Sequence, residues 1–526
     1  MRRSITQVAF GALVLFVSSA HSVALADSVT VLFHFEGSDS GSKIGTALQS
    51  LGDVNGDGFG DIAINSKSPR GTYVFYGGNP SDTLPDLFLQ GSSSISRMSD
   101  MTGDGIPDLL VSDATDSRIY LYRGFPDSLE STPYDSIVPD SAGYAFGGYL
   151  SVGMVGSDSV ADLVFSDPNY PNHGKVYYYE NPFSDDKVPD WAFLPGGFAR
   201  NIRNVGLIDF DGDTQLDIFI SMPGRVGEIG LVDTVGLIAV FLGPNYADTP
   251  DLVIAQPQGL DSIDWRQFPS GVANVADFDG DGWNDLAALY NTKPLIYLGG
   301  PSADTLVDFR LQGTTSLTSI AAAGDVNGDG GDDIVMGLTR TFWGAVDIYL
   351  GGSAMDIFYD LTITDDDLYP PRSIRNIGYQ VASAGDFNGD GYDDILITCR
   401  NLPSPAGQPH VVYLVAGSPS IVTDVTDDIA PNLPCAFSLA QNHPNPFNLS
   451  TAISLDLPER QHVTLKVFNI VGRHVITLLD RRLPAGRHQV EWNGADDSGQ
   501  WVGSGIYIYV LRGARGVKAR KMLLLK

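Results

Sequence analysis

Short apolar runs recur along residues 29–417, and each follows a loop of aspartate, asparagine and glycine. The clearest runs read DIAIN, DLLVS, DIFIS, DLAAL, DIVMG and DILIT, beginning at Asp61, Asp108, Asp217, Asp285, Asp333 and Asp394. A small-residue segment such as IGTALQSLGD precedes the loop. An aromatic-rich run such as TYVFYGG and a short segment such as PDLFLQG follow it. Runs of this length between turn residues indicate β-strands. The pattern predicts four strands per unit, as in a propeller blade, with the small-residue strand innermost.

The unit recurs along the chain at the spacing of a propeller blade. Loops begin at Asp53, Asp100, Met154, Asp209, Asp277, Asp325 and Asp386, on average about 56 residues apart. The seventh unit lacks an outer strand, whereas residues 29–35 form a strand without a unit. We therefore predict an all-β fold with a seven-bladed β-propeller over residues 27–419. Residues 29–35 would close the ring as the outer strand of the seventh blade, which leaves no open edge.

The loops have the oxygen-bearing residues that Ca²⁺ prefers. In the first loop, Asp53, Asn55, Asp57 and Asp61 occupy positions 1, 3, 5 and 9, and Phe59 at position 7 would offer its carbonyl. An EF-hand needs a glutamate at position 12 and flanking helices, but position 12 is apolar in these loops. A set of acidic turns without metal is the alternative. Recurrence of the same four oxygen positions in six loops favours structural calcium at up to six sites.

Each loop is named below by its first residue, and positions are counted from that residue. The candidate ligands of the six loops are Asp53, Asn55, Asp57, Phe59, Asp61; Asp100, Thr102, Asp104, Ile106, Asp108; Asp209, Asp211, Asp213, Gln215, Asp217; Asp277, Asp279, Asp281, Trp283, Asp285; Asp325, Asn327, Asp329, Gly331, Asp333; and Asp386, Asn388, Asp390, Tyr392, Asp394.

The loops are not equivalent. Thr102 is a weaker ligand than aspartate at position 3, and Thr214 replaces a glycine and is expected to strain its loop. The Met154 loop keeps only Asp158 and Asp162 in register, so we predict that it is metal-free.

These repeats resemble FG-GAP repeats, which form the propeller of integrin α-subunits and of many bacterial extracellular proteins. Phe146-Gly147 occupies the place of the family's Phe-Gly pair. The family's calcium signature, D-x-[DN]-x-D-G-x-x-D, matches the loops at Asp53, Asp277, Asp325 and Asp386 in full. The resemblance covers about residues 29–417 and implies a calcium-binding propeller that recognises a ligand with loops between blades.

A second domain is predicted at the C-terminus. Residues 420–436 are rich in Ser, Thr, Asp and Pro and indicate a linker. The alternation in AISLDL, VTLKVFNI and IYIYVLR predicts a small immunoglobulin-like β-sandwich over residues 437–526. This segment resembles the type A sorting domain of the type IX secretion system through QNHPNPFN from Gln441, LPAG from Leu483, WNG from Trp492, GSGIY from Gly503 and RKM from Arg520. The resemblance implies the type IX machinery as a partner; a plain C-terminal spacer domain is the alternative.

The N-terminus and the charge point to export. Residues 1–26 form a predicted signal peptide, with Arg2 and Arg3, an apolar core at 8–17 and a cleavage site at Ala24-Leu25-Ala26. A membrane anchor is the alternative, but the apolar run is too short to span a bilayer, and no later segment is long and apolar enough. We expect a secreted or cell-surface protein.

The composition excludes some classes of binding partner. The net charge of −31 argues against nucleic acid or an anionic membrane. Residues 437–526 alone carry 12 Lys/Arg and 6 Asp/Glu, so a basic segment follows an acidic one. Cys399 and Cys435 are the only cysteines, and both a disulfide and two separate thiols remain open.

The sequence carries no recognisable catalytic motif. Only His34, His173 and His410 belong to the predicted propeller, and none lies in a nucleophile or metal motif. We therefore predict a non-catalytic binding or adhesion protein with a protein or polysaccharide ligand. A secreted glycosidase or lyase is the alternative, because a pair of carboxylates could act outside the calcium loops. Tyr170, Trp191, Tyr246, Trp265 and Trp343 could form a ligand face, but packing within blades is the preferred interpretation.

Overall fold

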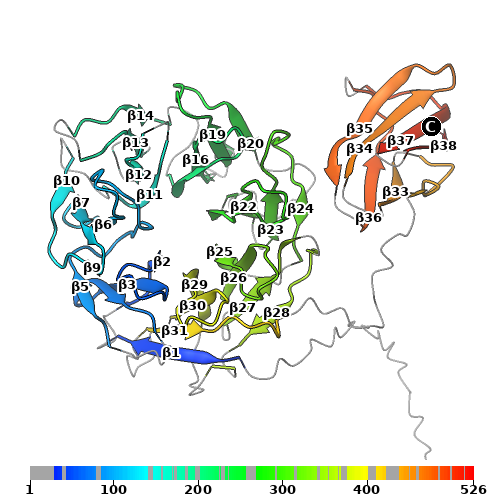
Figure 1. Cartoon of the computed structure of the whole chain (residues 1–526). Helices are drawn as coiled ribbons and strands as arrows, with labels where there is room; N and C mark the ends of the chain where they lie inside the picture. The colour runs from blue at the N-terminus through cyan, green and yellow to red at the C-terminus, as the bar shows by residue number, and fades with distance from the viewer. Residues whose placement is uncertain are drawn as a thin grey trace, which may run out of the picture. The chain divides into compact units, whose positions relative to one another are not determined.

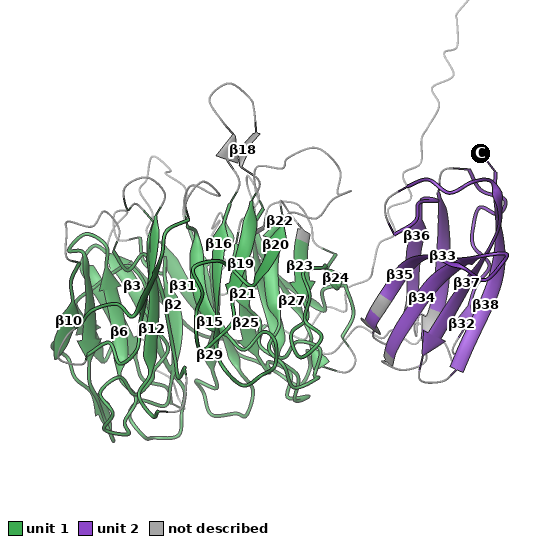
Figure 2. Cartoon of the chain, turned by 90° about the horizontal axis from the view of Figure 1, so that it is seen from above, with its two compact units in different colours: residues 1–424 green, residues 425–526 purple. Residues whose placement is uncertain are grey.

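The computed structural model describes residues 29–37, 43–78, 84–139, 146–155, 158–168, 170, 174–183, 187–195, 202–223, 225–226, 232–234, 236–255, 268–269, 271–290, 293–312, 317–339, 344–352, 355–364, 367–368, 376–400, 410–421, 438–448, 450–457, 461–483, 486–497, 500–513 and 516–525. The predicted signal peptide, most of the predicted linker, His173, Trp265, Trp343 and Cys435 lie outside these residues. The chain forms two compact units, Met1–Asp424 and Val425–Lys526 (Figure 2).

Unit 1 is built from small antiparallel sheets. Six antiparallel meanders of three or four strands follow one another along the described chain, and short hairpins interrupt two of them. The first two sheets contain β2 (Leu48–Gly52), β3 (Asp61–Lys67), β4 (Arg70–Phe75) and β5 (Leu87–Leu89), and then β6 (Leu109–Asp113), β7 (Arg118–Tyr122) and β10 (Asp135–Ile137). The third and fourth contain β11 (Tyr149–Gly153), β12 (Asp162–Asp167), β13 (Lys175–Tyr179) and β14 (Trp191–Phe193), and then β15 (Asn204–Ile208), β16 (Asp217–Met222), β19 (Leu237–Phe241) and β20 (Leu252–Ala255). The fifth and sixth contain β21 (Val272–Asn274), β22 (Leu286–Tyr290), β23 (Lys293–Tyr297) and β24 (Phe309–Arg310), and then β25 (Leu317–Gly324), β26 (Asp333–Thr339), β27 (Gly344–Tyr349) and β28 (Leu361–Ile363). Two further pairs, β8 (Gly124–Phe125) with β9 (Ser128–Leu129) and β17 (Arg225–Val226) with β18 (Val232–Thr234), are short hairpins.

A seventh sheet joins the two ends of unit 1. Its order is β1 (Val31–Glu36), β31 (Val411–Val415), β30 (Asp394–Cys399) and β29 (Ile377–Gly385). The first described strand therefore pairs with the last strand of the unit, with Phe35 opposite Val412. This confirms the predicted role of residues 29–35 as the outer strand of this sheet. The pairing covers the edge of β31 that would otherwise be exposed.

The sheets of unit 1 stand in a ring around a common centre (Figure 1). The first strands of neighbouring sheets contact one another, as β2 does with β29 and β25 does with β29. These are the small-residue strands, so their predicted inner position is confirmed. In the β6–β7–β10 sheet the corresponding segment forms no assigned strand but pairs with β6 through isolated bridges such as Ile95–Val111 and Ser99–Asp108.

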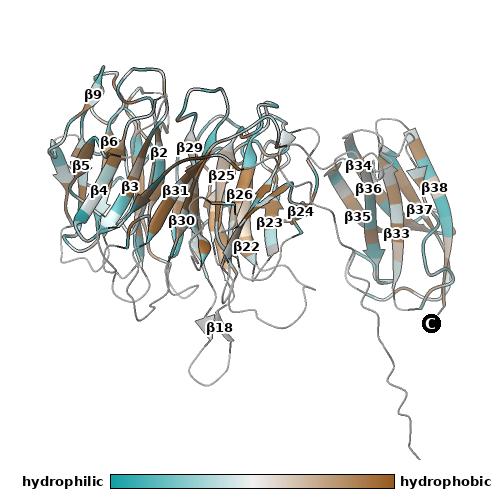
Figure 3. Ribbon diagram, turned by 90° about the horizontal axis from the view of Figure 1, so that it is seen from below, coloured by the Kyte–Doolittle hydropathy of each residue, from teal (hydrophilic) through white to brown (hydrophobic). Residues whose placement is uncertain are grey.

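The core of unit 1 lies between neighbouring sheets. One cluster joins Leu51 and Val74 of the first sheet to Leu109 and Tyr122 of the next, and another joins Ile62 to Leu396 of the closing sheet. Hydrophobic residues follow the strands, and the loops are largely hydrophilic (Figure 3). Packing between sheets, rather than within one, explains why a single repeat would not be stable alone.

The glycine of the Phe-Gly motif has a steric role between sheets. Gly147 has a φ of +72°, and its carbonyl accepts a hydrogen bond from the Ser112 hydroxyl of the preceding sheet at 2.6 Å. A Cβ at this position would lie 2.8 Å from the Cβ of Ser112. Gly45 repeats the arrangement with Thr398 at 2.7 Å and a φ of +67°. The motif needs glycine for both its left-handed conformation and its close approach.

Unit 2 consists of two sheets that share one core. One sheet has the order β32 (Ser438–Leu439), β33 (Thr451–Leu457) and β36 (Gly486–Trp492). The other has the order β35 (His474–Leu483), β34 (Gln461–Asn469), β37 (Gly505–Gly513) and β38 (Gly516–Leu524). Ile453 and Trp492 of the first sheet pack with Val467 and Tyr509 of the second. Within the described residues of the chain, no helix has the length and apolar character needed to cross a membrane.

Candidate metal centre

Five of the six predicted calcium loops connect the first and second strands of their sheets, and the Asp100 loop precedes β6. In the Asp53 loop, the Asp53 carboxylate accepts hydrogen bonds from the N–H groups of Gly56 (2.7 Å), Asp57 (3.1 Å) and Gly58 (2.8 Å). The Asp57 carboxylate accepts one from Phe59 at 3.0 Å. Gly56 and Gly58 have φ values of +74° and +90°, which only glycine adopts readily. The loop thus wraps its main chain around the side chain at position 1.

The other five loops have the same internal pattern. In each, the N–H at position 6 donates to the aspartate at position 1, and the N–H at position 7 donates to the aspartate at position 5. In the Asp209 loop the position-6 residue is Thr214, with a φ of +74°. A β-branched residue in this conformation costs about 1–2 kcal/mol, so the predicted strain is present.

The aspartate at position 9 has a structural task that the sequence did not reveal. Asp61 is fully buried, and its two oxygens accept hydrogen bonds from the N–H of Val54 in its own loop (2.7 Å) and of Gly77 after the third strand (2.8 Å). The carboxylate therefore ties the loop to the end of another strand. The same pair of bonds is present at Asp108, Asp162, Asp217, Asp285, Asp333 and Asp394.

In the Met154 loop the position-9 aspartate keeps its structural hydrogen bonds, although two of the predicted ligand positions are lost. Asp162 keeps both bonds, to Val155 at 2.8 Å and to Asn181 at 3.1 Å. Asp158 is exposed and accepts a bond from the Asn181 side chain at 3.1 Å. The retention of Asp162 in a loop that has lost other acidic positions was the signal that position 9 does more than bind metal.

Burial of these carboxylates raises their pKa. Desolvation is the main cause at Asp61, whose pKa rises to about 7, and at Asp285, whose pKa rises to about 8. At Asp61 the two main-chain hydrogen bonds act in the opposite direction, and the nearby charges of Asp57 and Asp53 add to the rise. Without a cation, several carboxylates thus converge on a site where negative charge is disfavoured.

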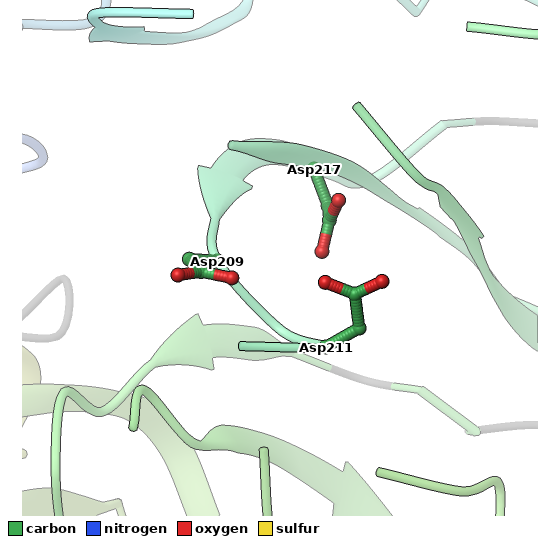
Figure 4. A group of neighbouring side chains, drawn as sticks. All are labelled: Asp209, Asp211 and Asp217. Atoms are coloured by element: carbon green, nitrogen blue, oxygen red, sulfur yellow. The ribbon is translucent and has the colours of Figure 1, made fainter. Parts of the chain in front are cut away.

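Two loops bring three carboxylates together closely enough for one cation. Asp209, Asp211 and Asp217 each offer an oxygen within 4.8 Å of the others (Figure 4), and so do Asp277, Asp279 and Asp285. In the Asp53, Asp325 and Asp386 loops an asparagine takes position 3. Its side-chain N–H donates to the position-5 carboxylate, as Asn55 does to Asp57 at 2.9 Å. An all-oxygen donor set of this kind suits a hard cation such as Ca²⁺ or Mg²⁺.

Trp191 and Tyr246, two of the aromatic candidates within the described residues, are used in packing. Trp191 stacks edge-on against Phe241 with ring centroids 5.1 Å apart, and Tyr246 donates its hydroxyl hydrogen bond to the Leu216 carbonyl at 2.8 Å. The preferred interpretation holds for these two residues. His410 is buried, and desolvation lowers its pKa. Cys399 is also buried.

Comparisons with known proteins agree with the repeat. The FG-GAP repeat family matches residues 377–399, which span β29, the Asp386 loop and β30. Integrin alpha-PS3 of Drosophila melanogaster is 33% identical over 101 residues, 16% of this chain and 9% of that protein. Integrin alpha-V of Gallus gallus is 24% identical over 266 residues, 50% of this chain and 23% of that protein. The chain therefore spans less than a quarter of the length of these relatives.

A solved structure also aligns with the chain. BBS1N in its complex with ARL6DN gives a TM-score of 0.49 at 12% identity, over 74% of this chain and 97% of that chain. The FG-GAP repeat and the integrin alpha relatives together support an integrin-like propeller.

Proposed function

We propose that the chain is an exported, calcium-stabilised, seven-bladed β-propeller that acts as a non-catalytic binding or adhesion protein in the medium or at the bacterial cell surface. The observation that carries the proposal is the recurrence of one oxygen-lined loop in six of the seven sheets, in a ring that resembles integrin propellers. The ligand would be a protein or a polysaccharide.

The loops fit structural Ca²⁺ in their donor chemistry. The side chains at positions 1, 3, 5 and 9 and the carbonyl at position 7 would hold the ion in the loops at Asp53, Asp100, Asp209, Asp277, Asp325 and Asp386. The ion would supply positive charge where buried carboxylates such as Asp61 and Asp285 have raised pKa values. The chain's own hydrogen bonds already orient these side chains, so binding requires little reorganisation.

Unit 2 would serve as the sorting signal for export. Its resemblance to the type A sorting domain and its basic composition support delivery of an acidic unit 1 by the type IX machinery. Cleavage of residues 1–26 would precede this step.

The first experiment is a binding assay with the full chain. The protein is incubated with Ca²⁺ and a panel of polysaccharides and extracellular-matrix proteins, and both retention and soluble fragments are measured. Retention without fragments supports a binding protein and identifies the ligand class. Release of fragments contradicts the proposal and favours the glycosidase or lyase alternative.

The metal is tested separately by equilibrium dialysis of the full chain against Ca²⁺. Up to six bound ions are expected, and Asp158→Ala in the Met154 loop should not change the number. Absence of saturable Ca²⁺ binding contradicts the metal assignment but leaves the binding function open.

A further inference from the structure

Neighbouring calcium loops are hydrogen-bonded to one another. The N–H of Gly60, at position 8 of the Asp53 loop, donates to the carbonyl of Asp386 at 2.8 Å, and the N–H of Asp393 donates to the carbonyl of Asp325 at 3.0 Å. In both pairs the acceptor is the position-1 residue of the preceding loop in the ring. The main chain that carries the first predicted ligand of one site is therefore held by the next site.

Two acidic residues outside the predicted ligand set extend this link. Asp332, at position 8 of the Asp325 loop, accepts a hydrogen bond from the N–H of Asp277 at 3.1 Å. Asp393, at position 8 of the Asp386 loop, accepts one from the N–H of Asp325 at 2.9 Å. Each of these carboxylates directly precedes a position-9 ligand of its own loop. A single dipeptide thus contacts two consecutive sites.

The side chains at position 7 make a third contact between loops. A Cβ on Gly328 would lie 2.5 Å from Cε1 of Tyr392, and a Cβ on Gly389 would lie 2.4 Å from Cε1 of Phe59. Each glycine is at position 4 of the preceding loop and has a positive φ. The N–H of Gly328 donates to the Asp325 carboxylate at 2.7 Å. The aromatic ring therefore packs against the turn that shapes the neighbouring site.

Four of the loops are linked in sequence around the ring, although Ala161 N–H also donates to the Asp100 carbonyl at 2.7 Å in another pair of loops. The loops at Asp277, Asp325, Asp386 and Asp53 follow one another in that order and cross the closing sheet, where β1 pairs with β31. We call these four loops the closing arc. They are the same four loops that match the calcium signature in full.

We propose that the metal sites of the closing arc are energetically coupled, and that Asp332, Asp393, Phe59 and Tyr392 are the positioning residues that couple them. This inference rests on the proposed calcium binding. A cation in one loop fixes the position-1 main chain, and that main chain bonds to position 8 of the next loop, beside its position-9 ligand. Coupling of this kind is reciprocal, so each ion raises the affinity of its neighbour.

Simple electrostatics predicts the opposite sign. Two bound cations repel each other, and salt near 0.15 M screens that repulsion beyond about 8 Å. Positive coupling would therefore have to come from the contacts between loops. This difference in sign makes the proposal testable.

The test uses Trp283, which lies at position 7 of the Asp277 loop and serves as a local reporter for Tb³⁺. The full chain is titrated with Tb³⁺ while Trp-sensitised emission is followed, and Trp283→Phe shows which part of the signal belongs to this loop. Asp329→Ala removes an exposed position-5 ligand from the adjacent Asp325 loop. We expect the Tb³⁺ affinity of the Asp277 loop to fall about fivefold or more, the usual lower range of coupled sites.

Asp104→Ala is the matched control, because Asp104 is the exposed position-5 residue of the Asp100 loop outside the arc. It should leave the affinity of the Asp277 loop within about twofold. In an Asp332→Ala background, Asp329→Ala should lose most of its effect, whereas Asp332→Asn should keep the coupling because its amide oxygen can accept the same bond.

Three results would overturn the proposal. If Asp329→Ala and Asp104→Ala had equal effects while Tb³⁺ still bound, the proposed coupling would be wrong, but the proposed calcium binding would stand. Equal behaviour of Asp332→Ala and Asp332→Asn would contradict a role for the hydrogen bond of Asp332 in the coupling. If neither Tb³⁺ nor Ca²⁺ bound in a saturable way, both the coupling and the proposed metal sites would be wrong.

Discussion

The position-9 aspartates show how one residue can serve both the fold and a metal. Each carboxylate is buried and satisfies two main-chain N–H groups from separate segments of its sheet. Charge-assisted hydrogen bonds of this kind are stronger than neutral ones. Except at Asp162, the second bond comes from a glycine, and sterics favour glycine there: a Cβ on Gly299 would lie 2.1 Å from the Asn284 carbonyl oxygen.

Asp162 tests the structural part of this role without a metal. Asp162→Ala leaves the buried N–H of Val155 and that of Asn181 without their acceptor. Each unsatisfied group costs about 1–3 kcal/mol, so we expect the free energy of unfolding to fall by about 2–4 kcal/mol in urea denaturation. Asp158→Ala, in the same loop but exposed, should change it by less than about 1 kcal/mol. Equal effects of the two variants would contradict this role.

The raised pKa values predict an unusual pH dependence in the absence of divalent cations. Asp61, Asp333 and Asp394 have pKa values of about 7 in the folded chain, against 3.8 as the ordinary value. The folded state therefore binds more protons between about pH 4 and 7, and the free energy of unfolding falls as pH rises through that window. With EDTA, urea midpoints should decrease from pH 5 to 8. Saturating Ca²⁺ should flatten or reverse this trend, and a metal-free midpoint that rises with pH would show the sign to be wrong.

At the scale of elements, the closing sheet depends on β1. Phe33 is 4% exposed, and its ring lies 5.5 Å from that of Phe75 and 5.6 Å from that of Phe387. Phe75 lies on β4 of the first sheet and Phe387 in the loop between β29 and β30 of the closing sheet, so Phe33 packs where the ring closes. The strand therefore contributes apolar contacts to the junction in addition to its pairing with β31.

Phe33→Ala measures this contribution. The substitution removes a buried ring, which costs about 3–5 kcal/mol of the free energy of unfolding. Phe358→Ala is the control, because Phe358 is 49% exposed and its truncation should cost less than about 1 kcal/mol. Thermal and urea unfolding of the two variants give the comparison. A loss at Phe33 no larger than at Phe358 would mean that β1 is dispensable.

At the scale of the whole molecule, the two compact units differ in charge and in candidate metal ligands. The described acidic metal groups lie in unit 1, whereas residues 437–526 carry an excess of positive charge. Each unit has a hydrophobic core of its own. Units of this kind are expected to unfold as separate cooperative transitions.

Calorimetry of the full chain should therefore show two transitions. A ligand that binds only the folded state raises the midpoint of the unit that binds it, so Ca²⁺ should raise one transition and EDTA should lower it. The transition of unit 2 should stay within about 1 °C under both conditions. A shift of both transitions together, or of neither, would contradict a metal role confined to unit 1.

The repeat, the strand order within each unit and the closing role of β1 could be predicted from the sequence, because they follow from local periodicity and a count of strands. The sequence also located the oxygen-bearing loops, since their spacing is local. The contacts between loops could not be predicted, because they depend on how the sheets pack around the ring. The bond from Gly60 to Asp386 joins positions more than 300 residues apart, and the contact of Phe59 with Gly389 arises from closure of the ring. In the sequence, Asp332 and Asp393 are acidic residues without an evident role. The main-chain N–H groups that they bind come close only when one sheet packs against the next.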